Sequence, residues 1–110
     1  MKSPRIKKVE SLVQKIAAET LRRELGPESA VVTVTSVEVS PDMRHATCWV
    51  GIIGRPDIQE KLYERTVNLR GVIQFALAGD MQTKFVPRIE IKRDTTGEYV
   101  QHIDELLKNN

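Results

Sequence analysis

The side chains that most often carry catalytic or metal chemistry are few in this sequence, and they stand far apart. His45 falls in an expected turn and His102 in an expected terminal helix, and neither has a Cys, Asp or Glu partner at metal-ligand spacing. Cys48 alternates onto an apolar strand face, which is typical of a buried small hydrophobe rather than a nucleophile. Asp104 and Glu105 are adjacent, and adjacent helix positions point apart. The sequence therefore predicts no enzyme activity, no metal site and no cofactor.

Positive side chains form the more informative set. They gather in residues 2–8, which contain no acid, on the outer face of the first expected helix, and around the third expected strand. Such a set attracts phosphate oxygens, and backbone amides freed at a helix bend can meet the same groups. We expect the cations to contact phosphates along one electropositive stripe, and Gly71 to set backbone geometry. The candidate nucleic-acid contacts are Arg5, Lys8, Arg22, Arg70, Gly71, Lys84 and Arg88.

Two other interpretations of the same residues stay open. The net charge is only +2, and nearby acids such as Glu60 and Glu90 would leave an ordinary solvated surface if they neutralised the cations. Alternatively, the chain is a protein-interaction module that docks through its exposed third strand. Salt separates the alternatives, because phosphate contacts weaken steeply with ionic strength and apolar docking does not.

Length and composition favour one ordinary globular domain over residues 1–110. The chain is 40% hydrophobic and 29% charged, within the usual range for such domains. No apolar run is long enough to cross a membrane, and the basic N-terminus lacks an apolar signal core, so we expect a cytoplasmic protein. We expect Trp49, Phe75 and Phe85 to be core or half-buried residues, which leaves a base-stacking surface unsupported.

Two helical segments are predicted to position the candidate residues. The first runs from about Pro4 to Leu25, with Ser3 as its N-cap. The second runs from about Asp57 to Ala78 and changes character at Gly71. Its first half has a narrow apolar stripe, whereas "VIQFALA" is almost wholly apolar, so we expect this half to be buried around most of its circumference. Because glycine accepts conformations and close approaches that a side chain blocks, we expect a bend at Gly71.

Three strands are expected beside these helices. β-Branched residues over 30–40 and alternating apolar residues over 46–53 predict an antiparallel hairpin. The apolar parity changes within the first of these strands, so we expect a β-bulge near Thr35-Ser36. "KFVPRIEIKRD" predicts the third strand, at a sheet edge because Pro87 has no N–H to donate. Residues 98–108 predict a short terminal helix.

Several segments together resemble the bacterial ribosome-binding factor A family. The first helix ends in "LRREL", and "VTVTSVEVSPDMRHATCWV" matches the family's strand, Ser-x-Asp turn and second strand. "RGVIQ" and "FVPRIEIKRD" match the remaining half at the expected distance. The resemblance covers nearly the whole chain, and the order and spacing of its parts make the combination specific.

This resemblance implies an α+β fold of the second K-homology type, with a three-stranded sheet, helices packed mainly on one face, and a helix-kink-helix at Leu69-Arg70-Gly71. Leu69 stands where the family usually has alanine, and we expect its larger side chain to point into the core. The resemblance also implies a non-catalytic, RNA-binding protein that associates with the small ribosomal subunit and assists late maturation and processing of its rRNA, often under cold stress. We expect that subunit and its rRNA as partners, no membrane, and a monomer.

Overall fold

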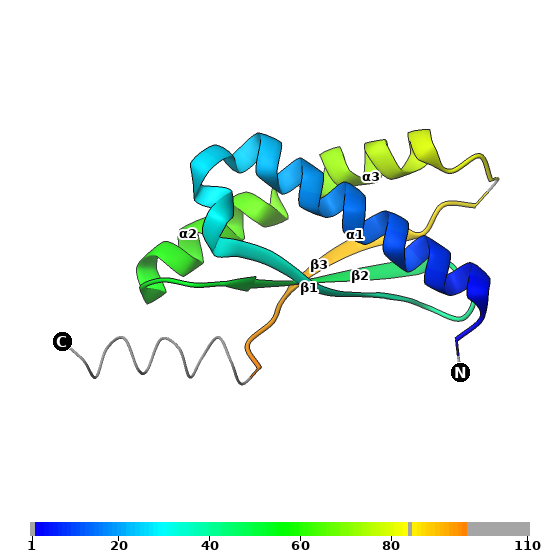
Figure 1. Cartoon of the computed structure of the whole chain (residues 1–110), viewed down its shortest axis with the longest axis horizontal. Coiled ribbons are helices and arrows are strands. Elements are labelled where there is room, and N and C mark those ends of the chain that lie inside the picture. Colours follow the sequence, from blue (N-terminus) through cyan, green and yellow to red (C-terminus); the bar gives the residue numbers. More distant parts are fainter. Residues whose placement is uncertain (1, 84, 97–110) are drawn as a thin grey trace.

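The computed structural model describes residues 2–83 and 85–96, which form a three-stranded sheet with the helices on one of its faces (Figure 1). The expected α+β class is therefore confirmed for the described residues, while the expected terminal helix over 98–108 lies outside them. The elements in chain order are α1 (Pro4–Leu25), the 3₁₀ helix η1 (Gly26–Val31), β1 (Val32–Val39), β2 (His45–Ile52), α2 (Pro56–Val67), α3 (Arg70–Asp80) and β3 (Arg88–Arg93).

Helix α1 begins and ends where its sequence predicts. Ser3 has extended backbone, and its hydroxyl accepts a hydrogen bond from the Ile6 N–H at 3.3 Å, while Pro4 occupies the first turn. At the other end Gly26 adopts a φ of 62°, a conformation that favours glycine. The helix lies across the sheet and contacts β1, β2 and α3. Its buried face consists of Val9, Val13, Ile16, Ala17, Thr20, Leu21 and Leu25.

Strands β1 and β2 form the expected antiparallel hairpin, and the expected bulge is present. Val34 pairs with Val50, but the next pair is Ser36 with Trp49, so Thr35 is the extra residue. The shift returns the later valines of β1 to the helix side of the sheet, where Val39 is buried opposite Ala46. Cys48 is also buried on this side, as expected.

Strand β3 pairs in parallel with β2 and forms one edge of the sheet, in agreement with the position expected for Pro87. Its outer edge is not open, because helix side chains bind its backbone. The Gln74 amide donates to the Pro87 carbonyl at 2.9 Å and accepts from the Ile89 N–H at 2.7 Å. The expectation of an exposed third strand is therefore wrong at these groups. Two further donors reach the same edge: Arg70 Nη1 to the Ile89 carbonyl at 3.4 Å and Tyr63 Oη to the Ile91 carbonyl at 3.4 Å.

The opposite edge of the sheet is held by a carboxylate from α1. The Val39 N–H donates to Glu10 Oε2 at 2.9 Å, and Lys2 Nζ donates to the same oxygen at 2.6 Å. The Glu10 side chain is only 13% exposed. This partial burial raises the pKa of its carboxyl, but the hydrogen bonds from Lys2 and from Val39 outweigh it, so the pKa lies below its ordinary value. The ionised form thus helps to hold α1 on β1.

The helix break between α2 and α3 lies at Asn68 and Leu69, just before the position expected from the sequence. At the end of α2 the Leu69 N–H donates to the Thr66 carbonyl at 3.0 Å, which tightens the last turn. The Leu69 carbonyl then accepts from the Ile73 N–H at 3.0 Å and starts α3. The Leu69 side chain is half-buried against the core, as expected from its size. The helix-kink-helix is therefore present, with Gly71 in the first turn of α3 rather than at the break.

The apolar second half of this segment is less buried than its composition suggests. Within α3 only Ile73 and Leu77 are buried, and the Phe75 side chain is 83% exposed. Helix α3 lies beside α1 at the margin of the helical layer and contacts α1 and β3, so its other side meets solvent (Figure 1). The expectation of an almost complete apolar girdle is wrong. Phe85 precedes β3 and is 73% exposed, so its expected burial is wrong too, whereas Trp49 is half-buried as expected.

Replacing Gln74 with alanine should weaken the attachment of β3. The variant leaves the Pro87 carbonyl and the Ile89 N–H without their side-chain partner, and a loss of about 2 kcal/mol in the free energy of unfolding is expected. Urea unfolding measures it. The control Gln14→Ala makes the same change at an exposed position of α1 and should stay within about 0.5 kcal/mol of the unmodified chain. Equal stabilities of the two variants would contradict the role given to Gln74.

Glu10 predicts a pH dependence of stability. Its carboxyl has a lowered pKa when folded, so the stabilisation is present above the ordinary value of 4.5 and is lost as pH falls through the lower folded value. The stability gap between the unmodified chain and Glu10→Gln should therefore narrow on acidification from neutral pH to about pH 3. Chemical unfolding at a series of pH values measures the gap. Glu19→Gln, at an exposed position of the same helix, is the control, and a Glu10→Gln gap that does not change with pH would refute the assignment.

Candidate RNA-binding surface

Helix α1 carries a row of cations on its outer side. Lys8, Lys15 and Arg22 are exposed and follow one another at seven-residue intervals, which is two helical turns. They therefore share one face, away from buried Val13, and extend over about 21 Å. None of the three forms an ion pair with a described residue. These three residues are called the α1 stripe below, and their charges are available to an external anion.

Arg70 is not available in the way expected. Its side chain is half-buried, and Nη1 points to the Ile89 carbonyl and to Gln74 Oε1 at 3.5 Å. The guanidinium thus belongs to the contact between α3 and β3. Arg70 stands one residue before an exposed glycine, but its charge serves the fold.

Gly71 is exposed, and its environment does not demand a glycine. An added Cβ would meet no heavy atom within 4 Å, and the backbone does not adopt a positive φ. The expectation that glycine permits the bend is therefore wrong. Leu69 provides no side-chain cap for the first amides of α3, and exposed Gly71 lies in the same turn.

The remaining candidates lie on different faces. Arg5 is exposed on α1, near its start, so it shares the helical layer with the α1 stripe. Arg88 lies in β3, where it pairs with His45 of β2. Its neighbour Ile89 is buried under the helices, and successive strand residues point to opposite faces, so Arg88 lies on the sheet face opposite the helices. The structure therefore divides the cations between two faces, and the expected single stripe is wrong. Lys84 lies outside the described residues.

Two further cations belong with the candidates. Lys15 completes the α1 stripe, and the seven-residue spacing is visible in the sequence alone. Arg44 lies in the β1–β2 turn and lines the same pocket as Arg5. No sequence signal could have found that neighbourhood, because it depends on how the turn folds back beside the start of α1.

The described residues contain no grouping suited to catalysis. Burial raises the pKa of the Cys48 thiol to about 11, which keeps it protonated near neutral pH. Within residues 2–83 and 85–96, no three His, Cys, Asp or Glu side chains gather as metal ligands, and no helix is long and apolar enough to cross a membrane.

The fold is an α+β domain of the K-homology-like class. Its defining features are a mixed three-stranded sheet, a single helical layer and a helix broken at Asn68-Leu69. Helix α1 carries the α1 stripe, whose cations form no ion pair with a described residue. The chain belongs to the ribosome-binding factor A family, whose model matches residues 5–107. Ribosome-binding factor A of Natranaerobius thermophilus is 35% identical over 109 residues, which cover 98% of this chain and 83% of the relative. The family is one of ribosome-binding factors, not of enzymes.

Solved structures agree with this fold. The solution NMR structure of a Thermotoga maritima candidate ribosome-binding factor A superposes with a TM-score of 0.72 at 26% identity, covering 89% of this chain and 94% of that one. A Thermus thermophilus ribosome-binding factor A model, fitted into a cryo-EM map of its complex with the 30S subunit, gives a TM-score of 0.57 at 20% identity. It covers 77% of this chain and 90% of its own.

Replacing Gly71 with alanine should leave the fold intact. Alanine is the better helix former, so the free energy of unfolding should stay constant or rise by up to about 1 kcal/mol. The matched control is Gly26→Ala, which forces a side chain into a backbone with φ of 62° and should destabilise by about 1 kcal/mol. Thermal or urea unfolding distinguishes them. A Gly71→Ala variant as unstable as Gly26→Ala would mean that the kink does require glycine.

Proposed function

We propose that this chain is a non-catalytic factor that binds the small ribosomal subunit in the cytoplasm and assists late maturation and processing of its rRNA. The observation that carries the proposal is the α1 stripe, three exposed cations that pair with no described residue, in a chain of the ribosome-binding factor A family. The complex of the Thermus thermophilus relative with the 30S subunit supports the choice of partner. We further propose that residues 1–110 act as one K-homology-like unit, as a monomer, with a role in growth in the cold.

Phosphate attraction explains how such a surface would work. Each cation that meets a phosphate releases condensed counterions, so affinity depends steeply on salt and little on base sequence. The stripe extends over about 21 Å, long enough to meet several phosphates of folded RNA. Structured RNA is recognised largely through its backbone and its shape. In this proposal the uncapped start of α3 adds backbone donors, and Gly71 allows a close approach to them.

Charge reversal of the α1 stripe tests the proposal. The variant Lys8→Glu/Lys15→Glu/Arg22→Glu should co-sediment poorly with immature small subunits, because three phosphate contacts become repulsive. The slope of log affinity against log salt should fall in magnitude by about 3. Co-sedimentation at several salt concentrations measures both effects.

The matched control reverses two cations on the open sheet face, Arg88→Glu and Lys92→Glu. If that control loses binding and the α1 variant does not, the proposal has the wrong face, and the early candidate Arg88 becomes the contact. If neither variant changes binding to the subunit and salt does not change the affinity, the result favours the alternative that the chain docks on another protein. The edge groups of β3 that Gln74, Arg70 and Tyr63 occupy weigh against docking by strand addition.

A further inference from the structure

A pocket lies beside the start of α1. Figure 1 shows that this end of α1 is far from the break between α2 and α3. The volume of the pocket is about 540 Å³, within the range of roughly 300–1,000 Å³ that ligand sites occupy. Three segments far apart in the sequence supply its walls: the start of α1, the β1–β2 turn and the loop after α3. The lining residues, called the end pocket below, are Arg5, Asp42, Met43, Arg44, Thr83 and Phe85.

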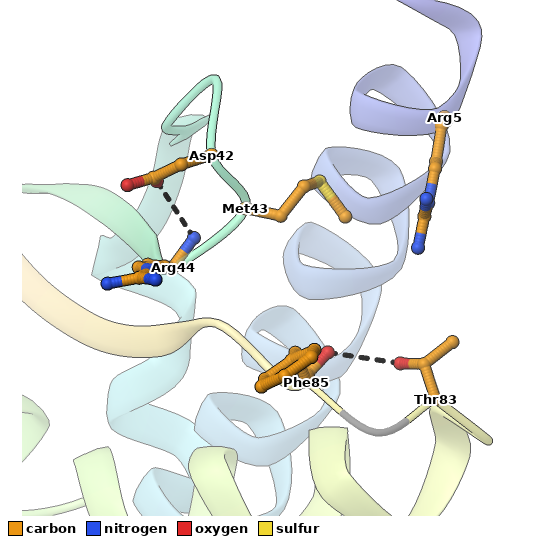
Figure 2. Close-up of a pocket in the computed structure, with 6 residues that line it drawn as sticks. All are labelled: Arg5, Asp42, Met43, Arg44, Thr83 and Phe85. Atoms are coloured by element: carbon orange, nitrogen blue, oxygen red, sulfur yellow. Dashed lines mark hydrogen bonds between the residues drawn. The ribbon is translucent and has the colours of Figure 1, made fainter.

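The β1–β2 turn is tightly organised around this pocket. Asp42 Oδ1 accepts from the Ser40 hydroxyl at 2.6 Å and from the Arg44 N–H at 3.1 Å. Met43 has a φ of 63°, which side-chain-bearing residues rarely adopt. Figure 2 shows the consequence: the Met43 side chain extends across the pocket toward α1 and Arg5. Strained backbone of this kind often belongs to a functional site.

The electrostatics of the end pocket favour an anion despite the acid in its wall. Arg5 and Arg44 form no ion pair with a described residue. The hydrogen bond from Ser40 and that from the Arg44 N–H lower the pKa of Asp42, so this carboxylate is ionised and held by the turn. It points away from Met43 and Arg5 (Figure 2). The end pocket therefore has two exposed arginines, Arg5 and Arg44, and one carboxylate, Asp42, which already accepts hydrogen bonds within the turn.

Thr83 and Phe85 supply another wall. Phe85 is 73% exposed, and its carbonyl accepts from the Thr83 hydroxyl at 3.0 Å, which fixes the loop locally (Figure 2). The ring and the Met43 thioether present polarisable surface between the two arginines. A free phosphate would leave that apolar surface uncovered, and an apolar peptide would offer no anion to the two guanidinium groups, which pair with no described residue. A planar base joined to a phosphate uses both.

We propose that the end pocket holds one unpaired nucleotide of the RNA, with its base against Phe85 and Met43 and its phosphate at Arg5 or Arg44. This proposal rests on the proposed function, since it names the part of the RNA that one site takes. It adds a contact that depends on single-stranded character, which the α1 stripe does not distinguish. A splayed base in this pocket would fix the position of the domain along the RNA.

The first test uses the intact isotope-labelled chain with a short oligouridylate as probe. Amide NMR signals of Met43, Arg44 and Phe85 should shift on addition of the probe. Phe85→Ala should weaken this binding about ten-fold, because a stacking partner of the base is lost. The matched control Phe75→Ala removes another exposed ring, from α3, and should bind like the unmodified chain. Equal binding by the two variants would overturn the proposal.

Met43→Gly is a second variant that separates binding from folding. Glycine accepts the positive φ, which offsets part of the packing against the core that the Met43 side chain provides, and thermal unfolding checks that the variant is folded. The folded variant lacks the thioether and should bind oligouridylate more weakly. Unchanged binding would contradict the placement of the base.

Inorganic phosphate and small subunits complete the test. If phosphate alone gives the same signal shifts with the same affinity, the pocket is an anion site and the nucleotide proposal fails. If the unmodified chain co-sediments with small subunits and Phe85→Ala does so with equal affinity, the end pocket is refuted while the proposed function stands. If the unmodified chain does not co-sediment, the proposed function fails and this proposal fails with it.

Discussion

The side-chain amide of Gln74 takes the place of a fourth strand. It donates to the Pro87 carbonyl and accepts from the Ile89 N–H, as a neighbouring peptide group would. A three-stranded sheet has two edges whose backbone groups need partners, and unprotected edges invite pairing with other chains. Here helix side chains supply those partners, Gln74 and Arg70 on β3 and Glu10 on β1. The position of α3, and with it the loop that leads to β3, depends on this attachment.

Because side chains cover backbone groups at both sheet edges, other surfaces are left for contacts with a partner molecule. Arg70 is held by β3, so it is not among the cations open to an external anion, which lie on the outer side of α1, at the end pocket and, with Arg88, on the open sheet face. In the proposed function the start of α3 adds geometry rather than charge, since Gly71 is exposed and no side chain caps the helix. Charge and backbone donors are thus held by different helices within one layer.

Sequence patterns predicted the elements well where the signal is local. The spacing of Val9, Val13 and Ile16 predicts the buried face of α1, and the parity change of the valines predicts the bulge at Thr35. The apolar content of "VIQFALA" led to a wrong prediction of burial around most of the helix, because composition does not reveal that α3 has neighbours on only one side. The partners of Arg70 and Gln74 are formed by tertiary contacts with β3, which no spacing rule encodes. For the same reason the end pocket, built by three distant segments, could not be anticipated.

The parallel pairing of β2 with β3 also shapes how the chain acquires its structure. The β1–β2 hairpin closes through a short turn, whereas α2 and α3 separate β2 from β3 along the chain. Because loop-closure entropy grows with the length of the closing loop, we expect the second pairing to be the slower event. The amide of Gln74 lies within that crossover, so we expect β3 to dock together with α3.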